Sequence, residues 1–122
     1  MSNKNPDPEN TPLILGIDIG SVSAALAVLT PEKEILYTDY RFHHGEITAT
    51  MEEMLAAVDA ERIEAVAATD GTPARVDADW RCDDRLAVIE AAAHFHGKPG
   101  AVLHVGGEKF SLMLFDAEGR YA

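Results

Sequence analysis

Apolar residues follow two different periods along the chain, and the change of period separates strands from helices. In the first third, short apolar runs separated by turns predict three strands in an antiparallel meander. These runs cover residues 13–19, 22–30 and 35–42. Over residues 48–60 the apolar positions recur with a helical spacing instead. The pattern predicts a helix there, capped by Thr48 or Thr50.

The second half of the chain continues this alternation of strand and helix. Residues 63–68 predict a strand and residues 83–95 a second helix, while residues 101–105 and 109–115 predict a hairpin. We expect one side of the second helix to be buried. That side would comprise Leu86, Val88, Ile89, Ala92, Ala93 and Phe95. We also expect Trp80 to pack beneath the loop before this helix, and the alternative is that it marks a partner surface. The predicted order is βββαβα followed by ββ, an α/β fold.

Composition and charge narrow the classes of partner and the compartment. The formal net charge is −11, with 21 acidic residues against 10 basic ones, and this excludes nucleic acid and membrane surfaces as partners. No apolar run approaches the roughly 20 residues that span a bilayer, and no signal peptide is visible, so we expect a cytoplasmic protein. Residues 1–12 are predicted to be a disordered tail. With Cys82 as the single cysteine, the chain forms no internal disulfide and no thiolate metal cluster.

The segment with the most chemical content is GIDIGSVS, residues 16–23. A carboxylate near the end of a buried strand is costly without a partner, and hydrated Mg²⁺ would suit Asp18. Gly20 permits a tight turn whose amides can face an anion, and Ser21 and Ser23 add hydroxyl groups. An ordinary hairpin in which Asp18 bonds to its own turn is the alternative. His43 and His44 are interpreted as loop residues rather than metal ligands.

GIDIGSVS resembles the first phosphate loop, D-x-G-[ST]-x-[ST], of the actin, heat-shock chaperone and sugar-kinase superfamily. Within that superfamily the chain is similar to the BadF/BadG/BcrA/BcrD family, ATP-dependent activators of 2-hydroxyacyl-CoA dehydratases and relatives of benzoyl-CoA reductase subunits. Four later segments look like further motifs of that family. They are TDG at residues 69–71, EAAAH at residues 90–94, LHVGGEK at residues 103–109 and DAEG at residues 116–119.

The resemblance implies a ribonuclease-H-like subdomain over residues 13–100 and the first hairpin of a second lobe over residues 101–122. It implies that ATP or ADP binds with Mg²⁺, and that Asp18 is a catalytic residue that holds the metal through water. The implied nucleotide-binding residues are Gly20, Ser21, Val22, Ser23, Gly106, Gly107 and Lys109. The implied protein partner is a CoA-ester dehydratase or reductase.

Departures from the family pattern affect the expected activity. Ala25 stands where the family commonly has Lys, His104 replaces the Asp of the second loop, and Glu108 with Lys109 replaces a Gln-Asp pair. The family's [4Fe–4S] cysteines and its adenosine-binding part lie beyond the second loop, so a cluster would belong to a full-length protein and not to this chain. We expect the parent protein to be an ATPase and this chain alone to be inactive.

Two other functions stay open at this stage. One is a regulatory or interaction module with a degenerate nucleotide site, and the other is a carbohydrate kinase of the same superfamily. The final hairpin would also leave unpaired strand edges, which predicts a homodimer or a domain-swapped form.

Overall fold

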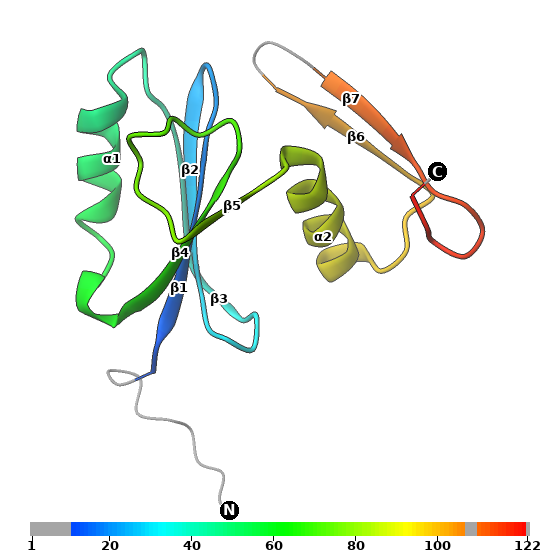
Figure 1. Ribbon diagram of the computed structural model, residues 1–122, viewed down its shortest axis with the longest axis horizontal. Helices are drawn as coiled ribbons and strands as arrows, with labels where there is room; N and C mark the ends of the chain where they lie inside the picture. The colour runs from blue at the N-terminus through cyan, green and yellow to red at the C-terminus, as the bar shows by residue number, and fades with distance from the viewer. Residues whose placement is uncertain (1–10, 107–109, 122) are drawn as a thin grey trace, which may run out of the picture.

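Five strands form the central sheet of the computed structural model, which describes residues 11–106 and 110–121 (Figure 1). The strands are β1 (Leu13–Ile19), β2 (Ser23–Leu29), β3 (Ile35–Phe42), β4 (Ile63–Thr69) and β5 (Trp80–Cys82). Their order in the sheet is β3-β2-β1-β4-β5. The first three strands pair antiparallel, as predicted, and β4 and β5 continue the sheet in parallel with β1. The sequence missed β5, which is three residues long and too short to show a period.

Alternation along β1 determines where the core lies. Leu13, Leu15, Ile17 and Ile19 are buried on one face, together with apolar residues of β2. Helix α1 (Ile47–Leu55) covers that face with Met51 and Met54, and the short 3₁₀ helix η1 (Ala60–Arg62) then leads into β4. Asp18 points to the opposite face, where it is exposed. Our expectation of a buried strand-end carboxylate was therefore wrong, because neighbouring strand residues face opposite sides of the sheet.

Helix α1 begins earlier and ends earlier than predicted. Its N-terminal cap is Glu46, which makes no side-chain capping hydrogen bond, so neither predicted threonine caps the helix. The chain reverses through His44 and Gly45, both with positive φ, and this turn starts the helix before Thr48. At the other end, the amide of Val58 donates to the carbonyl of Leu55 at 3.0 Å. Hydrogen bonds of this i→i+3 type tighten the last turn and end the α-helix.

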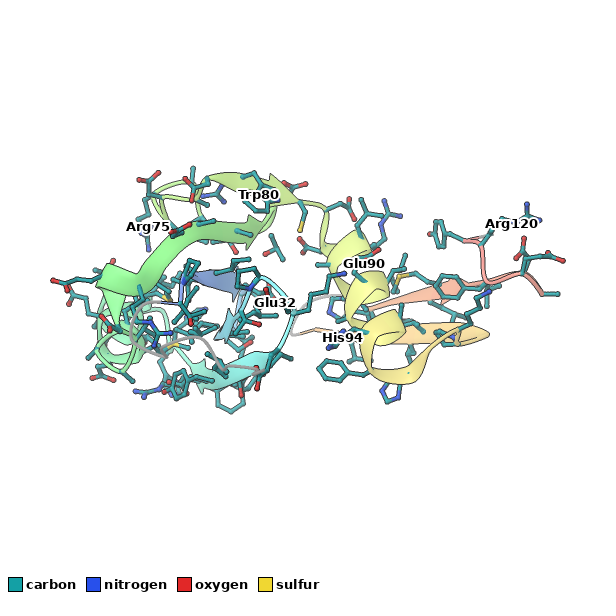
Figure 2. The ribbon with its side chains drawn as sticks, turned by 90° about the horizontal axis from the view of Figure 1, so that it is seen from below. Glu32, Arg75, Trp80, Glu90, His94 and Arg120 are labelled. Atoms are coloured by element: carbon teal, nitrogen blue, oxygen red, sulfur yellow. The ribbon has the colours of Figure 1, made fainter. Side chains whose placement is uncertain are left out.

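Helix α2 (Asp84–His96) lies beside the hairpin of β6 (Ala101–Val105) and β7 (Phe110–Leu114), which form a separate two-stranded sheet (Figures 1 and 2). The predicted buried side of α2 is not observed, since none of the helix residues is buried and Leu86 and Phe95 are exposed. The physical reason is that α2 packs mainly against β6 and not against the central sheet. Trp80 is also 55% exposed on the edge strand β5, which corrects its predicted packing.

One face of the β6–β7 hairpin is apolar and exposed. Leu103 and Leu112 are cross-strand neighbours, as are Val105 and Phe110, and all four side chains point to the same face as Leu114. These five side chains are 53–74% exposed. Met113, on the opposite face, is buried. Within the described residues, neither helix is long and apolar enough to cross a membrane.

Candidate functional site

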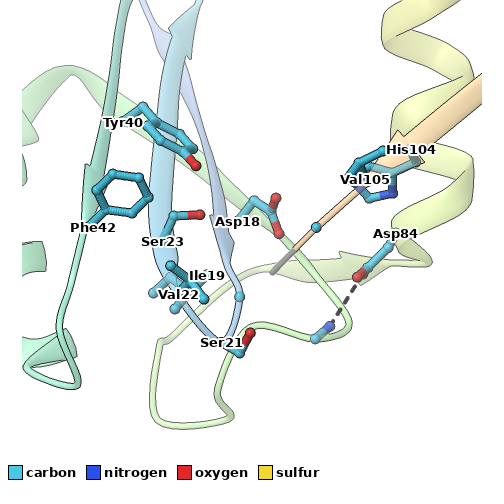
Figure 3. Close-up of a pocket in the computed structure, with 13 residues that line it drawn as sticks. Asp18, Ile19, Ser21, Val22, Ser23, Tyr40, Phe42, Asp84, His104 and Val105 are labelled. Carbon is cyan, nitrogen blue, oxygen red and sulfur yellow. Dashed lines mark hydrogen bonds between the residues drawn. The ribbon is translucent and has the colours of Figure 1, made fainter. Parts of the chain in front are cut away.

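A cavity of about 600 Å³ opens between the β1–β2 hairpin and the N-terminal ends of α2 and the β6–β7 loop (Figure 3). Its first wall comes from β1, β2, β3 and the loop that joins β1 to β2. Its second wall comes from α2 and from the end of β6. The residues that line it are Asp18, Ile19, Gly20, Ser21, Val22, Ser23, Tyr40, Phe42, Gly71, Asp84, His104, Val105 and Gly106. Segments far apart in the sequence thus share one concave site.

The β1–β2 loop (residues 20–22) lines the cavity and carries hydrogen-bond donors. The amide of Gly20 donates to the carbonyl of Ser23 at 2.9 Å, so this amide closes the turn and does not face a ligand. Among the described residues, neither the amide nor the hydroxyl of Ser21 has a hydrogen-bond partner, and the hydroxyl of Ser23 has none. Donors on a short turn that lines a cavity can bind an anion.

Gly20 has a role that differs from the predicted one. Its φ is not positive, and a Cβ added to it would meet no heavy atom within 4 Å. An ordinary residue would therefore fit the backbone of this turn. The added side chain would project into open space, and Gly20 is one of the residues that line the cavity.

His43 fixes the β1–β2 loop from the end of β3. Its side chain is buried, with Nε2 at 2.9 Å from the carbonyl oxygen of Gly20. The amide of Gly45 donates to Nδ1 at 3.0 Å, so Nδ1 is an acceptor and Nε2 carries the proton that it donates to Gly20. The amide of His43 also donates to the carbonyl of Val22 at 3.0 Å. The sequence interpretation of His43 as a loop residue missed this tertiary role, whereas His44 is exposed.

Asp18 faces the cavity from the same side of the sheet as Ala25 and Tyr40, which follow it in cross-strand register. Its Oδ1 accepts a hydrogen bond from the Thr69 hydroxyl at 2.8 Å. This partner lies 51 residues away, so the alternative that Asp18 bonds to its own turn is wrong. Asp18 forms no ion pair with any described residue, and its cross-strand neighbour on β2 is the uncharged Ala25.

Asp84 contributes a second carboxylate that the sequence did not single out. It lies in the first turn of α2 and accepts a long hydrogen bond from the amide of Gly71 at 3.4 Å (Figure 3). Its neighbour Asp83 caps the helix by accepting from the amide of Arg85 at 2.7 Å, and this bond lowers the pKa of Asp83. The sequence signal for Asp84 was only its position beside a capping residue.

The electrostatic field beside the cavity is negative. Burial raises the pKa of the Cys82 thiol, and the carboxylates of Asp70, Asp84 and, more weakly, Asp18 raise it further. An acidic surrounding of this kind repels phosphate groups. A cation bound beside these carboxylates would therefore favour the binding of a polyanion.

The predicted site residues are brought together in part. Asp18, Gly20, Ser21, Val22, Ser23 and Gly106 all line the cavity. Gly107 and Lys109 lie outside the described residues. Glu90 and His94 are exposed on α2 and do not line the cavity (Figure 2). Within the described residues, no three His, Cys, Asp or Glu side chains are close enough to bind a metal ion directly.

Solved structures with a similar fold include two dehydratase activators. The activator of 2-hydroxyisocaproyl-CoA dehydratase from Clostridium difficile, solved with bound ADPNP, matches 89% of this chain and 43% of its own, with a TM-score of 0.72 and 17% identity. Component A of (R)-2-hydroxyglutaryl-CoA dehydratase from Acidaminococcus fermentans matches 91% of this chain and 45% of its own, with a TM-score of 0.74 and 19% identity. This chain thus spans less than half the length of either activator.

A candidate N-acetylmannosamine kinase from Listeria monocytogenes is similar at a TM-score of 0.51 and 21% identity, over 90% of this chain and 49% of its own. No family model and no curated protein sequence matches the chain. Identities this low establish the fold alone. The mixed five-stranded sheet and these neighbours confirm the predicted fold class, and the chain has the α/β fold of the actin-like and ribonuclease-H-like ATPases and kinases.

Proposed function

We propose that this chain is the N-terminal part of an ATP-dependent activator of a 2-hydroxyacyl-CoA dehydratase or a related CoA-ester enzyme, and that it binds the phosphates of Mg·ATP. The observation that carries the proposal is the convergence on one cavity of a carboxylate and a turn with hydrogen-bond donors, where neither the carboxylate has an ion-pair partner nor the donors an acceptor among residues 11–106 and 110–121. The fold shared with two dehydratase activators, one of them solved with an ATP analogue, supports the choice of ligand and of partner.

The β1–β2 loop would bind phosphate through the Ser21 amide and the hydroxyls of Ser21 and Ser23. These groups have no partner in the part of the chain that the structure describes, and they lie on the turn that contains Gly20. Hydrogen bonds from fixed donors to a charged oxygen are stronger than those between neutral groups. Gly106 lines the opposite wall and would approach the nucleotide from there.

Asp18 would hold Mg²⁺ through a bound water. Its Oδ1 is engaged by Thr69, which leaves the second carboxylate oxygen for a water of the metal. Mg²⁺ usually keeps several of its waters and is bound through one or two carboxylates, which Asp18 and Asp84 could supply at this cavity. The oxygen atoms of Asp18 and Asp84 fit this ion, whereas the imidazole of His104 does not. Bound Mg²⁺ would neutralise phosphate charge in this acidic site.

Isothermal titration calorimetry with ATP, with and without Mg²⁺, tests the proposal. Asp18→Asn keeps an oxygen that can accept from Thr69 while it removes the charge, so it should abolish the Mg²⁺-dependent part of binding without unfolding the chain. Asp59→Asn is the matched control, because Asp59 loses the same charge and makes no side-chain capping bond. If the wild-type chain and a longer parent protein both bind no Mg·ATP, the proposed function is wrong.

A non-catalytic module is the second candidate, and Ala25 and His104 favour it. The cation expected beside Asp18 and the carboxylate expected on β6 are both absent, so the site would bind a nucleotide without hydrolysing it. ATP hydrolysis by the parent protein distinguishes the two candidates. Binding without turnover would support the module, and turnover would support the activator.

We propose a domain boundary near residue 100, and the division of the strands into two sheets supports it. Residues 13–82 contain the five-stranded sheet, and β6 and β7 form a sheet of their own after α2. We propose that residues 101–122 begin a second lobe of a longer protein. Limited proteolysis near Gly100 that releases a folded N-terminal fragment would support this boundary, and resistance of the whole chain would contradict it.

A further inference from the structure

Two buried threonine hydroxyls connect the loop after β4 to β1. The amide of Ile19 donates to Oγ1 of Thr72 at 3.0 Å, and this oxygen lies 2.9 Å from Oγ1 of Thr69. The Thr69 hydroxyl donates in turn to Oδ1 of Asp18 at 2.8 Å. Thr72 is 2% exposed and Thr69 is 8% exposed. The chain of bonds therefore runs through the protein interior and ends on the carboxylate that lines the cavity.

The groups at the two ends of this series of hydrogen bonds determine the direction in which every bond is donated. The Ile19 amide can only donate, so Thr72 accepts from it and keeps its own hydroxyl proton for another partner. The Asp18 carboxylate can only accept, so the single proton of Thr69 goes to Asp18. Thr69 must then accept the proton of Thr72. Every donor points toward Asp18, and bonds aligned in one direction polarise one another.

Arg81 on β5 fixes the loop after β4, which contains Thr72. Its guanidinium donates to the carbonyl of Thr72 at 2.7 Å and to that of Pro73 at 3.2 Å. It also donates to the carbonyl of Val76. A planar fork with several donors holds three carbonyls in a fixed arrangement, which a lysine ammonium would not do. The position of Thr72 is therefore determined by the loop and not only by its own two bonds.

We propose that Thr69 and Thr72 are positioning residues that orient the Asp18 carboxylate, so that Oδ1 faces the protein and the other oxygen faces the cavity. This inference deepens the proposed function and rests on it for the identity of the ligand, Mg·ATP. The chain of bonds also joins Asp18 to Ile19, the residue directly before the β1–β2 loop. The carboxylate and the start of the phosphate-binding turn are thus held by the same pair of hydroxyls.

Measurements on the ligand-free chain test the hydrogen bonds themselves. Thr72→Val should accelerate amide hydrogen exchange at Ile19 about tenfold, which is the effect of losing one buried hydrogen bond. Thr69→Val should change the ¹³C chemical shift of the Asp18 carboxyl carbon. Thr69→Ser and Thr72→Ser keep the hydroxyl and should restore both readouts. If Ile19 exchange and the Asp18 shift are unchanged in the valine variants, the proposal is overturned.

Thr30→Val is the control for a buried threonine. Its Oγ1 also accepts from a backbone amide, that of Glu34 at 3.1 Å, and it lies after the far end of β2 from the cavity. In calorimetry, Thr69→Val should weaken Mg·ATP binding about tenfold. Both Thr69→Ser and Thr30→Val should bind like the wild type.

Calorimetry and the measurements on the ligand-free chain together separate the positioning role of the threonines from the proposed function. If wild type binds Mg·ATP and Thr69→Val binds equally well, positioning by Thr69 is refuted while the proposed function stands. If neither the wild-type chain nor a longer parent protein binds Mg·ATP, the proposed function fails. The exchange and chemical-shift measurements then decide by themselves whether the two threonines orient Asp18.

Discussion

Replacing His43 by alanine is the most direct test of how the β1–β2 loop is held. The imidazole makes two hydrogen bonds, to the carbonyl of Gly20 at 2.9 Å and from the amide of Gly45 at 3.0 Å, and the side chain is 4% exposed. Each buried hydrogen bond contributes about 0.5–1.5 kcal/mol net, so losing both costs about 1–3 kcal/mol. The cavity left by the ring adds to this cost.

Urea denaturation followed by circular dichroism measures this loss. For a chain of this size the dependence of unfolding free energy on urea is about 1–3 kcal/mol per molar, so we expect the midpoint to fall by about 1 M. His44→Asn is the control, because His44 is exposed and has a φ of 51°, a conformation that asparagine tolerates. Its midpoint should stay within the effect of an ordinary surface substitution, about 0.5 kcal/mol.

A second readout connects stability to the loop. Freed from His43, the Gly20 carbonyl should turn toward solvent, and the amides of residues 20–22 should then exchange faster than those in the middle of β1. An His43→Ala variant that unfolds at the wild-type urea concentration, with unchanged exchange in this loop, would refute the assigned role of His43.

Three further predictions concern the site, helix α2 and the hairpin. Gly20→Ala and Gly100→Ala should each leave the free energy of unfolding unchanged or raise it by up to about 1 kcal/mol, as measured by thermal unfolding. The reason is that neither glycine has a positive φ and that a Cβ at either position meets no heavy atom within 4 Å. Only Gly20→Ala should weaken Mg·ATP binding. The hydrogen bond from the Arg85 amide lowers the pKa of Asp83 in the folded chain. The stabilisation that Asp83 gives is therefore fully present above the ordinary aspartate pKa, and it is lost as the pH falls through the lowered pKa of the folded state. Asp83→Asn should therefore flatten the stability curve below about pH 4, and an unchanged curve would contradict this. The exposed apolar face of the β6–β7 hairpin should produce a dimer in light scattering at high concentration, and a strictly monomeric mass would count against it.

The strands could be predicted because their signal is local. Leu13 to Ile19 is a short apolar run of seven residues, and the structure reproduces this strand and β3 with the predicted limits. The buried side of α2 could not be predicted, since helical spacing shows which residues share a face but not whether another element covers that face. The predicted capping residues of α1 were wrong for a related reason. The turn at His44 and Gly45, and not the threonine side chains, determines where the helix begins.

The candidate site was predictable only in the part that is continuous in sequence. Asp18 and the serines of the β1–β2 loop share one hairpin, so their spacing was sufficient to bring them together. The supporting residues His43, Thr69 and Thr72 act through hydrogen bonds between distant segments. Nothing in the pattern around a single buried histidine distinguishes a tertiary donor from an ordinary loop residue.

The two walls of the cavity differ in how they are supported, and this difference bears on catalysis. The wall with Asp18 and the β1–β2 loop is fixed by hydrogen bonds from β3 and from the loop after β4. The wall with His104 and Gly106 belongs to a two-stranded hairpin whose outer face is exposed and apolar. Under the proposed function the first wall alone would bind a phosphate group, whereas transfer of the terminal phosphoryl group to water, with ADP as the leaving group, requires donors fixed on both sides. We therefore expect the chain to bind Mg·ATP measurably and to hydrolyse it only when another part of the protein, or another copy, covers the hairpin.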